Sequence, residues 1–183
     1  MTRLSLLLLR DRSGNAAVEM ALVFPFLLLL MFGSIDLGNY FLSEHVADKA
    51  VRDAARYAAR LPVINSDGSV NYDCSSDPGT VATSAQTNIQ QLARFGDPSG
   101  SGTARLPGWT SNTMATVSLS CDKPPSTDSF VNAGIYTDFP NNGAVPRITV
   151  SATVPYNTLF GLAGLATATL NLNAQSQSAV IGA

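Results

Sequence analysis

The chain opens with a short basic segment, followed by a long run of apolar residues. Between Ala16 and Ile35 the only charged side chain is Glu19. About 20 such residues in a helix are enough to cross the hydrocarbon core of a bilayer. The preceding segment holds three basic residues and one acid: Arg3, Arg10, Arg12 and Asp11. The pattern predicts a membrane span over residues 16–41, with a cytoplasmic N-terminus and the chain after about Tyr40 outside.

A secretory signal peptide is the first alternative explanation of the apolar run. A signal-peptide cut requires small residues at its −3 and −1 positions, and no such pair stands between Met31 and Asp36. The run is also longer than the apolar core of a usual signal peptide. We therefore expect a single-pass anchor that stays in the membrane.

A helix is predicted beyond the membrane, over Ser43–Arg60. Alanine, the best helix former, dominates this segment. Pro62 ends it, because the residue before a proline disfavours helical geometry. Small residues at helical spacing predict one packing stripe, made of Val46, Ala50, Val51, Ala54, Ala55 and Ala58. The anchor and this segment are therefore expected to form one long helix.

Charged residues of the same segment are spaced for contact along the helix. Asp48 with Arg52, and Lys49 with Asp53, are i,i+4 pairs that predict ion pairs. Three arginines share another face: Arg52, Arg56 and Arg60. We expect that face to be solvated, with an acidic partner or anionic lipid headgroups as the alternative.

The rest of the chain predicts a small mixed domain. A second helix is expected over Thr80–Phe95, with Gly96 as its stop and with Val81, Ala85, Ile89 and Leu92 on its packing side. Period-two alternation predicts three strands, over Thr113–Cys121, Arg147–Val154 and Thr167–Gln175. The expected fold class is α+β, with a long N-terminal helix packed on a small antiparallel sheet.

Three other segments are expected to be loops or turns. Residues 65–78 are rich in Asn, Asp, Ser and Gly, and residues 123–143 carry Pro-Pro and Asn-Asn-Gly turn signals. The apolar stretch 158–166 ("TLFGLAGLA") is interpreted as a short helix or turn under the sheet. A hydrophobic tip that contacts a partner or the membrane surface is the alternative.

Charge and cysteine usage exclude several classes of protein. The net charge is −2, and no basic aromatic patch or zinc-type spacing appears, so no nucleic-acid partner is expected. The two cysteines, Cys74 and Cys121, are too far apart for a CxxC redox or zinc motif. Outside the cytosol a disulfide between them is expected, although sequence alone cannot establish the pairing.

No residue pattern indicates catalysis. The chain has no GxSxG, P-loop or HExxH motif, and its single histidine, His45, has no second ligand at helical spacing. We expect no catalytic residues, no metal, no cofactor and no small-molecule substrate. The protein is thus expected not to be an enzyme.

Glu19 calls for a specific explanation, because a carboxylate in a membrane helix costs a few kcal/mol and such residues tend to be functional. An acid at the membrane interface near the helix start is the simpler explanation, since the macrodipole favours a negative charge there. Gly14 suggests another. Cleavage after Gly14 would make Asn15 the new N-terminus and Glu19 the fifth residue. The new ammonium would lie one helical turn from the carboxylate and attract it strongly.

This arrangement resembles the type IV prepilin cleavage motif, in which a basic leader ends in Gly and Glu stands at position five. The sequence "RDRSGNAAVEMALVFPFLLLLMFGSIDLGNYF", followed by "ADKAVRDAARYAARLP", further resembles the TadE-like family of the tight adherence (Flp) pilus system. The resemblance covers roughly the first third of the chain. It departs from the family pattern at Met20, where an aromatic residue is common. Leu4 to Leu9 is also almost wholly apolar, unlike a typical polar leader.

The resemblance implies a minor pilin or pseudopilin that is needed for pilus assembly and therefore for adhesion or secretion. It implies a leader over 1–14 that a prepilin peptidase removes at Gly14–Asn15, an N-terminal helix over 15–60, and an extracytoplasmic domain over 61–183. It implies partners in the bacterial inner membrane and among other pilus assembly proteins, with Glu19 pairing with the Asn15 amine. The alternative is an unprocessed, signal-anchored periplasmic scaffold or binding protein.

Overall fold

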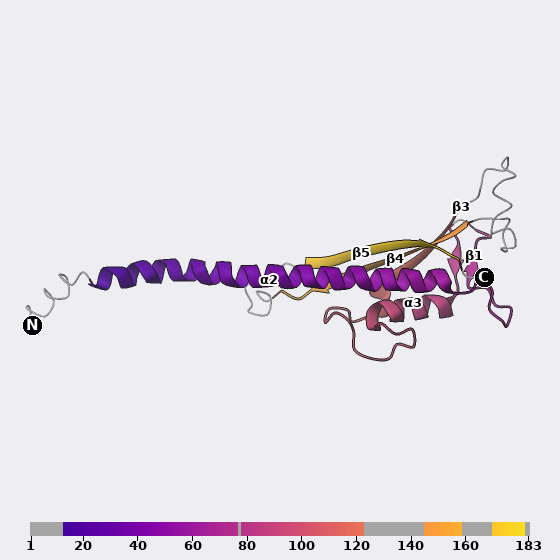
Figure 1. Ribbon diagram of the computed structural model, residues 1–183, viewed down its shortest axis with the longest axis horizontal. Helices are drawn as coiled ribbons and strands as arrows, with labels where there is room; N and C mark the ends of the chain where they lie inside the picture. The colour runs from indigo at the N-terminus through magenta and orange to yellow at the C-terminus, as the bar shows by residue number, and fades with distance from the viewer. Residues whose placement is uncertain (1–12, 77, 123–144, 159–169, 182–183) are drawn as a thin grey trace, which may run out of the picture. The chain divides into compact units, whose positions relative to one another are not determined.

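The computed structural model describes residues 13–76, 78–122, 145–158 and 170–181, with side chains from residue 16 onward. The predicted α+β class is confirmed: one long N-terminal helix is followed by small antiparallel sheets (Figure 1). The helix, α2 (Ser13–Arg60), has 48 residues and continues through Pro25. Its anchor part and its alanine-rich part are thus one element, as expected.

The chain divides into two compact units, Met1–Asn39 and Tyr40–Ala183, and the boundary falls inside α2. The part of α2 from Tyr40 to Arg60 therefore belongs to the same unit as the sheets, and we call it the outer part of α2. The other elements of this second unit are β1 (Tyr72–Asp73), β2 (Thr80–Val81), α3 (Thr83–Phe95), the 3-10 turn η1 (Asn112–Met114), β3 (Ala115–Asp122), β4 (Val145–Tyr156) and β5 (Leu170–Ala179).

The larger sheet has the order β3-β4-β5, and both of its pairings are antiparallel. All three predicted strands are present, with shifted ends, and β5 runs on to Ala179 where the sequence left its end open. The predicted alternation places one face of each strand in the core. In the central strand β4 the buried residues are Ile148, Val150, Ala152 and Val154.

The alanine stripe of α2 packs into the same core as this sheet face. It consists of Ala47, Ala50, Val51, Ala54, Ala55, Ala58 and Ala59. The sequence placed Val46 in the stripe, which is wrong: Val46 is 37% exposed and Ala47 only 1%. A helix has 3.6 residues per turn, so residues spaced four apart do not stay on one side of it. At the N-terminal end of the stripe the buried position is therefore 47 and not 46.

The outer part of α2 and β5 run in the same direction. At one end, the Tyr40 ring meets the Tyr156 ring edge-on at 5.3 Å, and Tyr156 pairs with Leu170 at the start of β5. At the other end, the Ile181 amide donates to the Ala59 carbonyl at 2.8 Å. Figure 1 shows β5 drawn along this part of α2.

The segment predicted as a loop over 65–78 contributes to the core instead. Tyr72 is buried, and its hydroxyl donates to the Ala58 carbonyl of α2 at 2.6 Å. The buried side chain of Asn71 donates to the Pro62 carbonyl at 2.8 Å. The polar composition that indicated a loop thus supplies the hydrogen bonds that hold this segment against the helix end.

A disulfide joins Cys74 to Cys121, with their Cα atoms 5.7 Å apart. It ties the segment after β1 to the end of β3. Gly79 lies against the bond, and a Cβ there would be 2.7 Å from the Cys121 sulfur and 2.8 Å from the Asp73 carbonyl oxygen. Only glycine fits this close approach.

The second helix begins later than predicted. Thr80 and Val81 pair with β1 as strand β2, and α3 starts at Thr83. Its buried residues are Ala85, Ile89 and Ala93, so Ala93 takes the place expected for the half-buried Leu92. Gly96 ends the helix with φ 85°, as predicted for a left-handed stop.

Two predicted segments fall outside the described residues. These are the surface loop over 123–143 and all but the first residue of the apolar stretch 158–166. Their interpretations stay predictions.

Replacing both cysteines, as Cys74→Ala with Cys121→Ala, should lower the free energy of unfolding of the outer domain by about 2–4 kcal/mol. The disulfide restrains a long stretch of the unfolded chain, because its cysteines are 47 residues apart. Urea unfolding of the full chain in detergent, followed by fluorescence of the single, buried Trp109, measures the loss. Thiol reduction should destabilise the wild type equally and leave the variant unchanged; a reduced wild type as stable as the oxidised one contradicts this.

Tyr72→Phe should cost about 1–2 kcal/mol at neutral pH, because it removes the buried hydrogen bond from the Tyr72 hydroxyl to the Ala58 carbonyl, which keeps only the longer bond from the Leu61 amide. Burial raises the pKa of the Tyr72 phenol. Tyr72 ionises near pH 10 in the unfolded chain but stays protonated in the folded one. The contribution of its hydroxyl to the free energy of unfolding is therefore lost as pH rises above about 10. The stability gap between wild type and variant should therefore narrow in urea titrations at about pH 11. The half-buried Tyr57, changed to Phe, is the control; a constant gap refutes the assignment.

Candidate membrane and assembly segment

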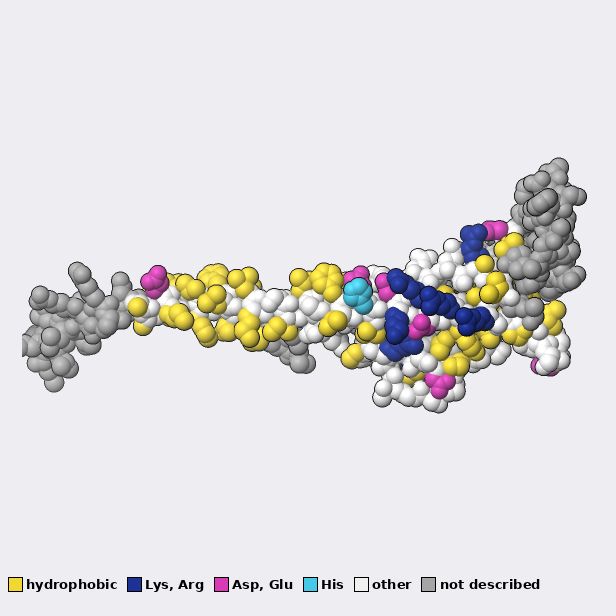
Figure 2. All heavy atoms as spheres, in the orientation of Figure 1, with side chains coloured by type: hydrophobic (Ala, Val, Ile, Leu, Met, Phe, Trp, Pro, Cys, Tyr) yellow, Lys and Arg dark blue, Asp and Glu magenta, His cyan; other side chains and the backbone are white. Residues whose placement is uncertain are grey.

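Apolar side chains cover the whole circumference of α2 in the unit Met1–Asn39. Exposed examples that point in all directions around the helix are Val18, Met20, Phe24, Phe26, Leu30 and Phe32. Figure 2 shows yellow side chains all along this part of the helix, with white atoms between them. A helix that is apolar all round is stable only when it is buried in protein or in lipid. Among the described residues one helix is long and apolar enough to cross a membrane, and it fits a single-pass anchor.

Glu19 lies exposed near the start of this helix, beside Ala16, Met20 and Val23. The backbone of residues 13–15 is already helical, so both sides of the Gly14–Asn15 bond belong to α2. The side chain of Asn15 lies outside the described part of the chain. Asn15 and Glu19 are four residues apart and thus stand on the same side of the helix.

This spacing suits a contact between a new N-terminal amine and the Glu19 carboxylate. Side chains in a helix lean toward its N-terminus, so Glu19 reaches back over the preceding turn. A cut after Gly14 would leave an ammonium on Asn15 about 6 Å back along the helix axis. The free backbone N–H groups of a helix start also favour a negative charge.

The other residues considered for chemistry are placed far from this segment in the sequence. Cys74 and Cys121 are both in the disulfide, so neither offers a thiolate. His45 is exposed on the outer part of α2. Within the described ranges, no three His, Cys, Asp or Glu side chains gather as a metal ion would require.

The ion pairs along the outer part of α2 match the sequence expectation only in part. Asp48 and Arg52 pair at 3.6 Å, as predicted. Asp53 does not pair with Lys49, which was the expectation; it pairs with Arg105 at 3.1 Å, from the segment that follows α3. Sequence gave no signal for this long-range pair. It joins α2 to that segment, and Lys49 stays exposed on the helix.

The three arginines predicted to share a face are all exposed. Figure 2 shows the dark blue side chains together on the outer part of the helix. Arg52 pairs with Asp48, whereas the described side chains offer Arg56 and Arg60 no acidic partner.

Comparison with known proteins gives a match to a family model. Residues 14–56 match the model of the TadE-like protein family. The resemblance read from the sequence is thereby confirmed for the N-terminal part of the chain. The TadE-like region begins at Gly14 and ends one turn before the end of α2, so it takes in the apolar segment and most of the alanine stripe. Searches of curated proteins and of solved structures each found no match.

The TadE-like match indicates involvement in tight-adherence pilus assembly. It lies wholly within α2, and the sheets of the outer domain are beyond its end. The match therefore concerns the anchor and the helix that leads out of it.

Proposed function

We propose that this chain is a minor pilin or pseudopilin of a tight-adherence pilus. It is anchored in the bacterial inner membrane by one span, with its N-terminus in the cytoplasm and its outer domain in the periplasm. Its role is structural: it supports pilus assembly, and through it adhesion or secretion, and it catalyses no reaction.

The observation that carries the proposal is where the TadE-like region starts. It begins at Gly14, the residue before the suspected cut, and contains Glu19 at the fifth position after it. The apolar surface of the helix then continues over the length that a bilayer requires. The basic residues before Gly14 favour a cytoplasmic N-terminus.

The proposed mechanism has three steps. The chain inserts with its basic leader inside, a prepilin peptidase hydrolyses the Gly14–Asn15 bond, and the new Asn15 ammonium pairs with Glu19. The pair forms within one chain or between neighbouring subunits, where it would set the axial register. In the second case the attraction is large, because lipid screens charges poorly.

Partners in this proposal are other pilins and assembly proteins that meet the outer domain and the outer part of α2. The unprocessed scaffold is the competing proposal, favoured by the apolar residues of the leader at 4–9. The two proposals share the fold and the location, so cleavage of the Gly14–Asn15 bond is what distinguishes them.

The mature N-terminus is the first measurement. Mass spectrometry of protein made in its own membrane should give a chain that begins at Asn15 when the cognate peptidase is present. Without the peptidase, or with Gly14→Val, the leader should remain, because a bulky residue at the cut blocks access. An intact Met1 chain in the presence of the peptidase would refute the processed pilin and leave the anchored scaffold.

Glu19→Gln should hinder pilus assembly while membrane insertion stays normal. The variant keeps the size of the side chain but removes the charge that attracts the amine. Pilus numbers counted by electron microscopy, beside the amount of protein in the membrane fraction, measure the two effects. Glu44→Gln, the same change outside the apolar segment, is the matched control. Normal pilus numbers in Glu19→Gln would rule out this role for the carboxylate.

A further inference from the structure

The edge of β5 that faces away from β4 is open as far as the described residues go. Val180, just after the strand, donates its amide to the Pro146 carbonyl of the neighbouring chain segment at 3.0 Å. Hydrogen-bonded pairs alternate along an antiparallel ladder, so the even-numbered residues of β5 bond to β4 and the odd-numbered ones point away from it. Five residues thus present their N–H and C=O groups outward: Asn171, Asn173, Gln175, Gln177 and Ala179. No described residue bonds to these groups.

The opposite edge of the sheet, on β3, is closed by the chain itself. The Gln90 side chain of α3 donates to the Ala115 carbonyl at 2.8 Å. Gly79 bridges to Leu119 farther along the strand, and the disulfide holds Cys121 at its end. The described residues therefore cover one edge of the sheet and leave the other uncovered from Asn171 to Ala179; beyond it, the Ile181 amide bonds to α2.

The open edge also lacks the features that normally protect an edge strand. Such strands are usually short, charged, interrupted by proline or distorted by a bulge. β5 has ten residues without a charge or a proline, and its register with β4 is regular over ten pairs. An uncharged, regular edge of this length is a ready template for another strand.

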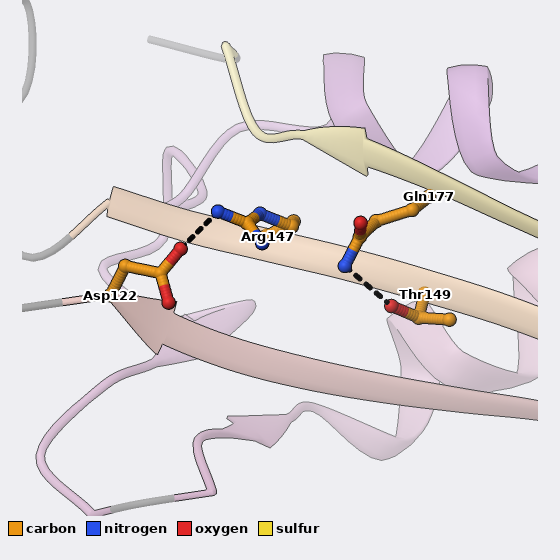
Figure 3. A network of polar contacts seen from close by, with 4 residues as sticks. All are labelled: Asp122, Arg147, Thr149 and Gln177. Atoms are coloured by element: carbon orange, nitrogen blue, oxygen red, sulfur yellow. Dashed lines mark hydrogen bonds and ion pairs between the residues drawn. The ribbon is translucent and has the colours of Figure 1, made fainter.

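The surroundings of the edge are neutral as well. On the outer face of the sheet, Gln177 donates to Thr149 at 3.2 Å, as Figure 3 shows. The ion pair that the described residues form on this face, Arg147 with Asp122, links β4 to β3, on the side away from the open edge. On the core side, Leu170 at the start of β5 is 48% exposed and lacks a covering neighbour strand.

We propose that the open edge of β5 is a docking site for an extended segment of another protein, which adds a fourth strand to the sheet. In this incoming strand, the residues that lie beside the amide side chains of β5 are uncharged. The residues that alternate with them point to the core side and are apolar, so that they cover Leu170. This inference rests on the proposed function, because it takes the partner from the pilus assembly proteins.

A second copy of this chain is a poor occupant of the edge. Identical edge strands that pair across a two-fold axis perpendicular to the sheet run antiparallel. Because β5 runs in the direction of the outer part of α2, such a pair would turn the two helices in opposite directions. In that pair the Tyr40 end of each helix, which leads into the anchor, would lie beside the Arg60 end of the other. A different protein is free of this restriction.

Hydrogen exchange of the β5 amides provides the first test. In the full chain purified alone in detergent, the odd-numbered amides should exchange at least about tenfold faster than the even-numbered ones, because only the latter bond to β4. In the native membrane, before extraction, the odd-numbered amides should slow by about tenfold or more. Equal and fast exchange of these amides in both samples overturns the proposal.

Photo-cross-linking identifies what covers the edge. A benzophenone side chain placed at position 173 or 177 of the full chain should react with one continuous segment of another protein. The two attachment points on that segment should lie about four residues apart, as for paired strands. Adducts to a second copy, adducts within the chain, or adducts scattered over a partner would each overturn the proposal.

A proline tests the hydrogen bonds of the edge. Gln175→Pro removes an outward N–H and spares the ladder to β4, so the domain should still fold, with Trp109 fluorescence as the check. The cross-link from position 173 should fall about tenfold, whereas Gln175→Thr, which keeps the N–H, should retain it. Equal yields from the two variants overturn the proposal.

Failure of the docking site and failure of the proposed function give different results. A mature chain that begins at Asn15 and has a freely exchanging edge would overturn the docking site alone. An intact Met1 chain in the presence of the peptidase would overturn the pilin assignment, whatever the state of the edge.

Discussion

The close packing of alanines on the outer part of α2 against the sheet is the contact on which the rest of the domain depends. Side chains of one carbon let the helix approach closely, and the buried faces of β3, β4 and β5 supply the larger apolar groups. Tyr72, the Asn71 side chain and Arg105 then attach the remaining segments to the helix or to its end. A helix whose first part fits a membrane anchor thus also supports a folded domain.

The two halves of α2 share one continuous backbone but differ in how their apolar side chains are distributed around the helix. In the first half, large apolar side chains point in every direction, and their burial must come from lipid. In the second half, apolar residues are confined to one side, and arginines occupy the exposed side. The change in residue size and polarity occurs close to the boundary between the two compact units.

Periodicity was enough to predict the elements whose pattern is strong. The long helix, the three main strands and the stop at Gly96 all follow from local spacing. The predictions were wrong where contacts with residues far away in the sequence determine a side chain's partner or its burial. Asp53 has a helical neighbour of opposite charge, yet Arg105 approaches it from beyond α3. Tyr72 and Asn71 sit in a polar, loop-like sequence, and only their hydrogen bonds to the end of α2 make them core residues.

The candidate site depended on residue identity more than on folding. Gly14 and Glu19 were singled out because an acid is costly in an apolar run and because their spacing fits a cut. The structure adds that both stand on one continuous helix. The open edge of β5 could not be inferred in the same way, since sequence does not tell which strand is central and which edge its neighbours cover.

The hydrogen bond between Ile181 and Ala59 has a consequence for how the protein is made. The alanine stripe is synthesised long before β5. Because β5 completes the core around the stripe, that core cannot close until β5 has been made. The domain therefore has a high contact order and folds late. Until then the alanine stripe and the strands remain uncovered, and chaperones or assembly partners have their longest access to them.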